Sequence, residues 1–221
     1  MPLVTLDDVR KNNKVRVFIG KSDDFLEKLG YTEHGFRHSE IVARLARKIM
    51  SDLNLPDREG ELAAIAGYLH DIGNVSGRNG HDFAGAMVAM EILQDLGMSY
   101  EEQADIIGAI GNHDEGEGRV VNRITAALIL ADKSDVHRSR VRNRDIAAFD
   151  IHDRVNYAVE ESHIIVDCDE KLITLRLKIN NDISHVMEYF EIFLSRMVMC
   201  RRAASFLDAR FSLVINDAQL L

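Results

Sequence analysis

The sequence has only two prolines, Pro2 and Pro56, and two cysteines, Cys168 and Cys200, among its 221 residues. With so little proline, long helices can run without interruption. The cysteines form neither a CxxC pair nor a disulfide framework, so we expect two reduced thiols that are partly buried.

Positive charge is also scarce, because 27 Lys and Arg residues stand against 36 Asp and Glu residues, a formal net charge of −9. We therefore expect no nucleic-acid scaffold as a partner, since proteins that bind one need a basic surface to neutralise phosphates. A small phosphorylated substrate is compatible with this charge, because a bound metal ion can supply positive charge locally.

Long apolar runs are missing as well. No stretch approaches the roughly 20 residues needed to span a bilayer, and residues 1–14 have no apolar segment of the signal-peptide type. We therefore expect a cytoplasmic protein without a membrane partner. The apolar fraction of 46% is ample for a packed core, and the length suits one domain with at most a small appendage.

Apolar residues recur at helical spacing from about residue 33 to residue 160, which predicts a series of amphipathic helices. The expected helices are residues 33–53, with Ile41, Leu45, Ile49 and Leu53 on one face; residues 58–73, closed by Gly73; a helix from His81; a helix from Ser99, with Glu102 completing a capping box; and residues 123–135.

The period changes after about residue 160. Residues 163–179 alternate between apolar and polar positions around a turn at residues 168–170, which predicts a β-hairpin. A long amphipathic helix follows, with an apolar stripe from Val186 to Ala204, and residues 211–216 alternate again. We expect a mainly α protein, with an all-helical domain over residues 1–160 and a small α+β subdomain over residues 161–221.

Four histidines and two aspartates fall on inward-facing positions of the expected helices: His38, His70, Asp71, His81, His113 and Asp132. Burying even an uncharged polar group without a partner costs on the order of 2–7 kcal/mol. A hydrogen bond to a carbonyl would explain any one histidine. Six such groups on one core are explained most simply by a shared metal ion, since imidazole and carboxylate bind Fe, Mn, Zn, Ni and Co.

The position of His70 next to Asp71 matters for such a site. Neighbouring side chains on a helix point about 100° apart. At the end of a helix the two groups can therefore flank one ion, or Asp71 can bridge two ions. Gly73 would end the helix and let the chain leave the site.

The order His38, His70-Asp71, Asp132 resembles the H…HD…D signature of the HD superfamily of metal-dependent phosphohydrolases. The segments AGYLHDIG and LILADKSD resemble the second and the last motif of the family, and the likeness covers roughly residues 33–140. It implies a first metal held by His38, His70, Asp71 and Asp132, and a second metal held by Asp71, His81 and His113.

The cofactor that the resemblance implies is a divalent transition metal, as one or two ions, with Fe or Mn favoured over Mg, Ni, Co and Zn. The sequence departs from relatives that act on cyclic dinucleotides at two places. It has Asn112-His113 where they have a histidine pair, and Asn74 where they often have lysine. These differences argue against that subfamily.

The implied chemistry is hydrolysis of a phosphate ester or anhydride, in a nucleotide or a similar small metabolite, by water that the metal activates. Asp71 would orient this water and act as its base. Lys133 and Asp135, beside Asp132, are candidate acids or supporting residues, and a surface ion pair is the alternative reading.

The segment HRSRVRNR at residues 137–144 is the densest basic stretch of the chain. If it is helical, Arg138 and Arg142 share a face with Asp135, and arginine suits phosphate through paired hydrogen bonds. Substrate binding by Arg138 and Arg142 is therefore one expectation. A solvated face or an oligomer contact, as in a homodimer, is the alternative.

Two weaker candidates lie near the expected site. His34, four residues before His38, could share a metal, but a surface histidine at the start of a helix explains it as well. Glu115 could edge the cleft or belong to a polar loop.

Two other classes of function stay open. A regulatory module could bind metal and nucleotide without turnover, although open coordination positions would be unnecessary in a purely structural site. A metal-dependent oxygenase is the other alternative, and consumption of oxygen would distinguish it.

Overall fold

The structure, a computed structural model, describes residues 3–143 and 145–220. The helical part consists of α1 (Leu6–Lys11), α2 (Asn13–Lys28), α3 (Phe36–Asp52), α4 (Asp57–Leu69), α5 (His81–Asp95), α6 (Tyr100–Ile110), α7 (Arg123–Ser134) and α8 (Ile151–Ala158). The C-terminal part consists of β1 (Val159–Asp167), β2 (Leu172–Ile179), α9 (Val186–Phe206), β3 (Arg210–Ile215) and β4 (Ala218–Gln219). The predicted mainly α fold with a small α+β part is confirmed.

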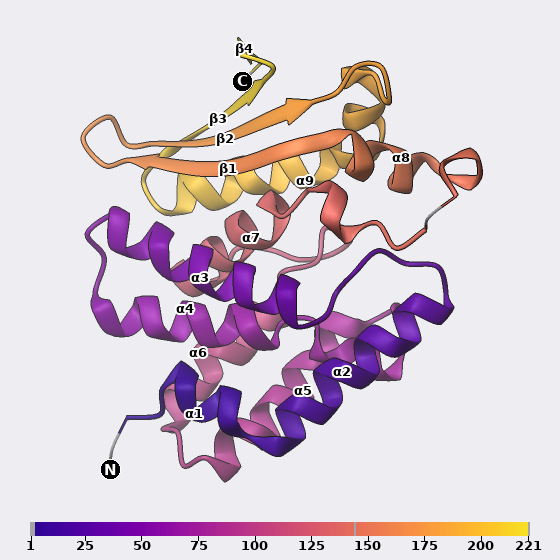
Figure 1. Cartoon of the computed structure of the whole chain (residues 1–221). Helices are drawn as coiled ribbons and strands as arrows, with labels where there is room; N and C mark the ends of the chain where they lie inside the picture. Colours follow the sequence, from indigo (N-terminus) through magenta and orange to yellow (C-terminus); the bar gives the residue numbers. More distant parts are fainter. Residues whose placement is uncertain (1–2, 144, 221) are drawn as a thin grey trace.

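The sheet lies across one end of the helical part, with α9 between the two (Figure 1). β1 and β2 form the predicted hairpin, and β3 pairs in parallel with β2 through the connecting helix α9. Ile173, Leu175 and Leu177 of β2 are buried, as their alternation predicts. On α9, Tyr189, Phe193 and Met197 are buried too, so this helix fills the space under the sheet.

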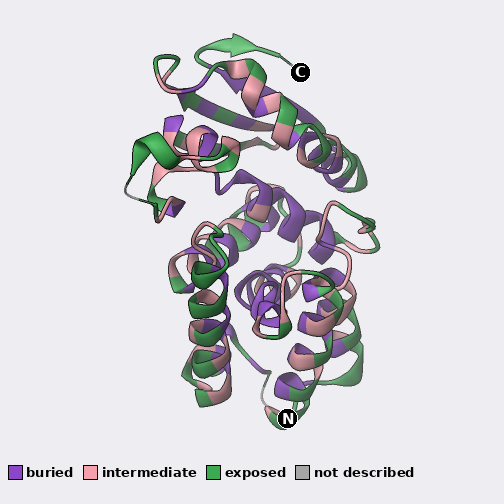
Figure 2. Cartoon of the chain, turned by 90° about the vertical axis from the view of Figure 1, so that its right-hand side faces the viewer, coloured by how far each residue is buried: buried purple, intermediate pink, exposed green. Residues whose placement is uncertain are grey.

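In the helical part, α4 lies between other helices. Every residue from Leu62 to Leu69 is buried, and α3, α6 and α7 all pack against it. Figure 2 shows the buried residues gathered in the middle of this part. Small side chains permit the close approach, because a Cβ atom on Gly67 would lie only 3.0 Å from the backbone of Ala43.

The buried face of α3 agrees only in part with the one that the sequence predicts. Val42, Ala46 and Ile49 are fully buried, whereas Ile41 and Leu45 are only partly buried. Alanines on the inner face let α3 approach α4 closely, and the larger Ile41 and Leu45 lie at the edge of this contact. The predicted stripe is therefore confirmed at Ile49, and at Ile41 and Leu45 the most buried positions lie one residue further along the chain.

Helices α1 and α2 precede the predicted ones, and one further expectation about local structure needs correction. A capping box at Thr5 and Asp8 begins α1. The basic segment is not an extension of α7, which ends at Ser134 and is followed by a single 3-10 turn at Arg138–Arg140. The helical face shared by Arg138, Arg142 and Asp135 does not exist.

One hydrophobic core includes residues of the helical part and of the C-terminal part. The change from helix to strand comes at Val159, where α8 passes directly into β1. The division into two domains at residue 160 stays a prediction.

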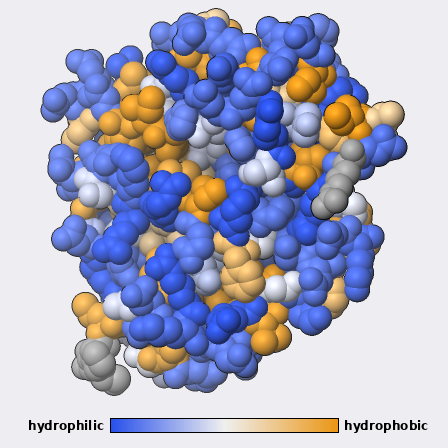
Figure 3. Space-filling model, in the orientation of Figure 1, coloured by the Kyte–Doolittle hydropathy of each residue, from blue (hydrophilic) through white to orange (hydrophobic). Residues whose placement is uncertain are grey.

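The surface in the view of Figure 3 is mostly hydrophilic, with its apolar residues in several separate groups. Among the described residues, no helix is long and apolar enough to cross a bilayer. The homodimer and the cytoplasmic location stay predictions.

Candidate metal centre

Four separate helix ends bring the histidines together. His38 lies in the first turn of α3, His70 directly follows α4, His81 begins α5, and His113 follows α6. All four are buried. Because each histidine stands at an end rather than in the middle of a helix, the backbone of the next segment can turn away and leave the centre to side chains.

The turn after α4 brings Asp71 close to His81. Residues Ile72–Ser76 form a 3-10 turn against the start of α5. A Cβ atom on Gly73 would lie 2.0 Å from the carbonyl oxygen of His81 and 2.3 Å from the amide nitrogen of Gly85. Only glycine permits this contact, so Gly73 is required for the geometry of the site.

Three of the histidines have the same orientation. The Nδ1 atoms lie 2.8 Å from Gly67 O for His70, 3.0 Å from Arg78 O for His81 and 2.6 Å from Ile110 O for His113. A carbonyl oxygen can only accept a hydrogen bond. Each Nδ1 therefore carries the proton, and each Nε2 presents a lone pair.

His38 reaches the same orientation through a carboxylate. Its Nδ1 atom lies 2.7 Å from Asp135 Oδ2. Arg37 bonds both oxygens of the Asp135 carboxylate, at 3.3 and 3.0 Å. A carboxylate behind an imidazole fixes the ring and makes the opposite nitrogen a stronger ligand.

The Nε2 atoms point at one another. They are 3.2 Å apart in the pair His38 and His70, and 3.2 Å apart in the pair His81 and His113. Two lone pairs at this distance repel unless a proton or a metal ion lies between or beside them. The donor chemistry therefore fits a cation that several imidazoles share.

Two carboxylates complete the cluster. Asp71 Oδ2 lies 3.3 Å from His70 Nε2, and Asp71 Oδ1 lies 3.5 Å from His81 Nε2. Asp132 Oδ1 lies 3.3 Å from His38 Nε2. Three groups have ligand atoms close enough to hold a metal: His38, His70 and Asp71; His70, His113 and Asp132; and Asp71, His81 and His113.

The structure thus brings together all six residues that the sequence proposes as metal ligands. The third group, Asp71, His81 and His113, is the set predicted for the second metal. Asp71 also belongs to the first group, with His38 and His70. A buried cluster of histidine and carboxylate ligands that can hold a divalent metal is present. Which residues ligate an ion, and how many ions, stay predictions.

The charges at the centre stabilise one another. Burial raises the pKa of Asp71, but His70 beside it holds that pKa well below its ordinary value. Burial lowers the pKa of His70, but Asp71 and Asp132 more than offset this and raise it to about 10. In the protein without metal, a proton on His70 therefore supplies part of the positive charge that a metal would bring.

Lys133 connects this centre to the loop before α7. Its ammonium group lies 2.7 Å from Asp132 Oδ2 and 2.6 Å from Glu115 Oε2. Burial lowers the pKa of Lys133, but Asp132 and Glu115 raise it above its ordinary value. Lys133 is not a surface ion pair, and it stays protonated beside a predicted metal ligand.

A cavity of about 370 Å³ lies next to the cluster. Its lining includes His34, Arg78, Arg140, Asn156, Phe193 and Arg196. The His34 ring lies 5.6 Å from the ring of His38, and Arg78 Nη1 lies 3.3 Å from Asp71 Oδ1. These contacts make the cavity the approach to the candidate metal centre.

The predicted substrate arginines do not line this cavity. Arg138 pairs with Glu160 at 3.1 Å, and Arg142 pairs with Asp23. From the same basic segment it is Arg140 that faces the cavity, because the chain after α7 turns instead of continuing as a helix. Substrate binding by Arg138 and Arg142 stays a prediction without support from their positions.

Arg78 was missed by the sequence analysis. A signal was available, because Arg78 is the only lysine or arginine between His70 and His113. Arg196 gave no such signal, since it lies on α9, more than 60 residues beyond Asp132 in the sequence.

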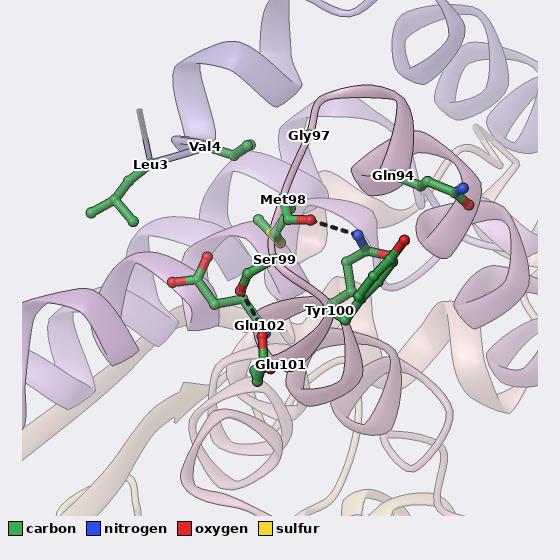
Figure 4. Close-up of a pocket in the computed structure, with 10 residues that line it drawn as sticks. Leu3, Val4, Gln94, Gly97, Met98, Ser99, Tyr100, Glu101 and Glu102 are labelled. Carbon is green, nitrogen blue, oxygen red and sulfur yellow. Dashed lines mark hydrogen bonds between the residues drawn. The ribbon is translucent and has the colours of Figure 1, made fainter. Parts of the chain in front are cut away.

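A second cavity, of about 550 Å³, lies near the N-terminal segment and the start of α6 (Figure 4). Ser99 caps α6 there, and Gln103 Nε2 donates to the carbonyl of Met98. None of the six clustered histidines and aspartates lines it. None of the six lines the smaller cavity either, but two residues of that cavity contact them: Arg78 Nη1 lies 3.3 Å from Asp71 Oδ1, and the His34 ring lies 5.6 Å from that of His38.

The comparison with known families agrees with this centre. The HD domain model matches residues 35–155, more than half of the chain. The chain therefore belongs to the HD domain family, a superfamily of metal-dependent phosphohydrolases. The match includes all six residues of the cluster.

A curated relative is similar over a longer stretch. The uncharacterized protein MJ1020 of Methanocaldococcus jannaschii is 30% identical over 206 residues, which cover 82% of this chain and 78% of the relative. Part of this likeness must lie outside residues 35–155. The relative's name specifies no substrate.

Proposed function

We propose that the chain hydrolyses a phosphate ester or anhydride in a small phosphorylated metabolite, with nucleotides as the substrate class. The observation that carries the proposal is the position of Asp71, whose two oxygens face His70 on one side and His81 on the other. A carboxylate in this position can bridge two metal ions, an arrangement suited to in-line displacement at phosphorus.

Divalent metal ions held here would lower the pKa of water towards neutrality and bind phosphoryl oxygens. The other contributions come from the chain itself. Asn74 and Arg78 hold Asp71 Oδ1, at 2.8 and 3.3 Å. Arg78 also lines the cavity, so its guanidinium is placed to meet the negative charge of a phosphoryl group.

Lys133 has a supporting role in this proposal. Because its ammonium group is held between Asp132 and Glu115 and stays protonated, it neutralises two carboxylates and fixes the orientation of Asp132. This favours a positioning residue over the acid that the sequence suggested. Mixed imidazole and carboxylate ligands suit Fe or Mn, with Mg, Ni, Co and Zn as alternatives.

The test combines metal analysis of anaerobically purified protein with phosphate release from a panel of nucleotides. Asp71→Ala should lose bound metal and activity together. Asp169→Ala, in the exposed turn between β1 and β2, is the matched control and should retain both.

Full activity of Asp71→Ala, or hydrolysis by metal-free wild-type protein, would refute the proposal. Metal and nucleotide binding without phosphate release would instead support the regulatory module. Uptake of oxygen with a candidate substrate would support the oxygenase.

A further inference from the structure

The C-terminal part of the chain contributes to the cavity beside the candidate metal centre. Phe193 and Arg196 of α9 line it, together with Asn156 of α8. α9 lies outside residues 35–155, which match the HD domain. The helix therefore supplies part of the cavity wall that the family match does not account for.

Arg196 is held in a defined orientation. Its Nε atom donates to Glu115 Oε1 at 2.8 Å, and its guanidinium carbon lies 4.5 Å from the centre of the Phe193 ring. Within the described part of the chain, its two terminal nitrogens make no hydrogen bond. Because Arg196 lines the cavity, we infer that these donors can serve a bound ligand.

A row of ion pairs leads from Arg196 to the metal centre. Glu115 binds Arg196 with one oxygen and Lys133 with the other, and Lys133 binds Asp132. Arg78, in contrast, contacts Asp71 directly. Arg196 therefore contacts no candidate ligand directly, whereas Arg78 does, so Arg196 is suited to a group of the substrate other than the reacting one.

The cavity wall carries both charges, from two aspartates, Asp150 and Asp153, and from three arginines. Arg78, Arg140 and Arg196 all line it. The donors of Arg140 are used by the backbone, at Glu33 O and Asp135 O, so this side chain contributes charge and few free hydrogen bonds. Arg196 is thus the arginine best placed to bond a second anionic group, as a planar fork of donors does.

We propose that Arg196 of α9 is a substrate-binding residue that holds a second phosphoryl group, next to the one at the metal centre. The inference rests on the proposed function and narrows its substrate class to molecules with two adjacent phosphoryl groups, such as nucleoside di- and triphosphates. A monophosphate at the metal centre would leave the terminal nitrogens of Arg196 without a phosphoryl group to bind.

The test measures binding and needs no turnover. Methylenediphosphonate, which cannot be cleaved as an anhydride, and inorganic phosphate are titrated into metal-loaded protein by calorimetry, with the same excess of free metal in each cell. Wild-type protein should bind the diphosphonate more tightly than phosphate. Arg196→Gln should lose about tenfold or more in affinity for the diphosphonate, as expected for a charge-assisted hydrogen bond, and little for phosphate.

Two variants separate this role from a structural one. Arg201→Gln, exposed on the same helix, should bind both probes as the wild type does. Arg196→Lys keeps the charge without the fork and should give an intermediate preference for the diphosphonate. Metal content should be unchanged in all three variants, because Arg196 touches no candidate ligand.

Equal diphosphonate affinity in wild-type and Arg196→Gln protein would overturn the inference. So would loss of metal from both Arg196 variants, because Arg196 would then act on Asp132 through Glu115. If no nucleotide is hydrolysed but the diphosphonate preference depends on Arg196, the proposed function fails and the binding role stands. If nucleotides are hydrolysed and binding is unaltered, only the binding role fails.

Discussion

At the scale of single residues, the direction of each histidine depends on what its Nδ1 atom bonds. Three backbone carbonyls and the carboxylate of Asp135 occupy these positions. Asp135 differs from the carbonyls because it brings a full negative charge. Burial raises its pKa, but a hydrogen bond from His38 and the charge of Arg140 hold that pKa below the ordinary value.

Asp135→Asn should weaken metal binding by about 10–100-fold, the usual effect of losing a carboxylate behind a ligating histidine. The asparagine keeps the shape of the side chain but removes the negative charge that makes His38 Nε2 a stronger metal ligand. Titration of the metal-free protein with the metal measures the change. Asp169→Asn is the control, and an unaltered affinity in Asp135→Asn would contradict a ligand role for His38.

At the scale of elements, the turn between α4 and α5 is the most constrained segment of the site. Gly73 has no room for a side chain, because backbone atoms of His81 and Gly85 occupy the space. Backbone cannot rotate aside as a flexible side chain can. Any larger residue must push the start of α5, and with it His81, away from Asp71.

Gly73→Ala should therefore destabilise the protein by about 1–3 kcal/mol or more, the range for overpacked sites, and lower its metal content. Chemical denaturation and metal analysis measure the two effects. Gly108→Ala in α6 is the matched control, since its Cβ atom would meet only Val121, at 3.7 Å. There alanine should be neutral or stabilise by about 0.5–1 kcal/mol. Equal effects of the two substitutions would contradict the packing argument.

The start of α9 depends on an ionised carboxylate. Glu188 accepts hydrogen bonds from Arg154, at 2.5 Å, and from Ser184, at 2.7 Å. These bonds lower its pKa from the ordinary value of 4.5 to about 2. Since the folded state favours the ionised form, the contribution to stability is complete above pH 4.5 and is lost as the pH falls towards 2.

Glu188→Gln should consequently lower the thermal midpoint by a constant amount above about pH 5. The difference from wild type should shrink as the pH falls from 4.5 to about 2. Thermal unfolding across this range tests the prediction, with exposed Glu191→Gln on the same helix as the control. A difference that does not depend on pH would show that the ionised form is not what matters.

At the scale of the whole molecule, the C-terminal part is joined to the helical part by packing and by charge. α9 packs against α7, which carries Asp132 and Lys133. The partly buried ion pairs from Arg196 through Glu115 to the buried Lys133 cross the same contact. Removing one partner of a buried pair leaves an uncompensated charge, which is strongly destabilising.

A fragment of residues 1–160 should therefore fail to fold as a cooperative unit. It would expose the face of α7 that α9 covers and leave Glu115 and Lys133 without Arg196. Near-ultraviolet circular dichroism and thermal unfolding of the fragment, beside the full chain, measure this. A cooperative transition with normal metal content would instead establish an independent domain at the predicted boundary.

The sequence by itself determined the order of most elements and the six candidate ligands. Helical and alternating periods are local properties, so the helices from α3 to α7, the hairpin and α9 could be predicted from neighbouring residues. The candidate ligands could also be predicted from local patterns. They are ionisable groups on apolar helix faces, and such groups need a partner when they are buried. The resemblance to the HD family added their grouping.

Only the tertiary structure decided what surrounds the ligands. Arg78 and Arg196 line the cavity beside the centre from a loop and from a distant helix, and no local period encodes such contacts. The choice of Arg140 over Arg138 and Arg142 depended on where the chain turns after Ser134. The buried face of α3 depended on how closely α4 approaches it. In each case the outcome was set by packing between segments far apart in the sequence.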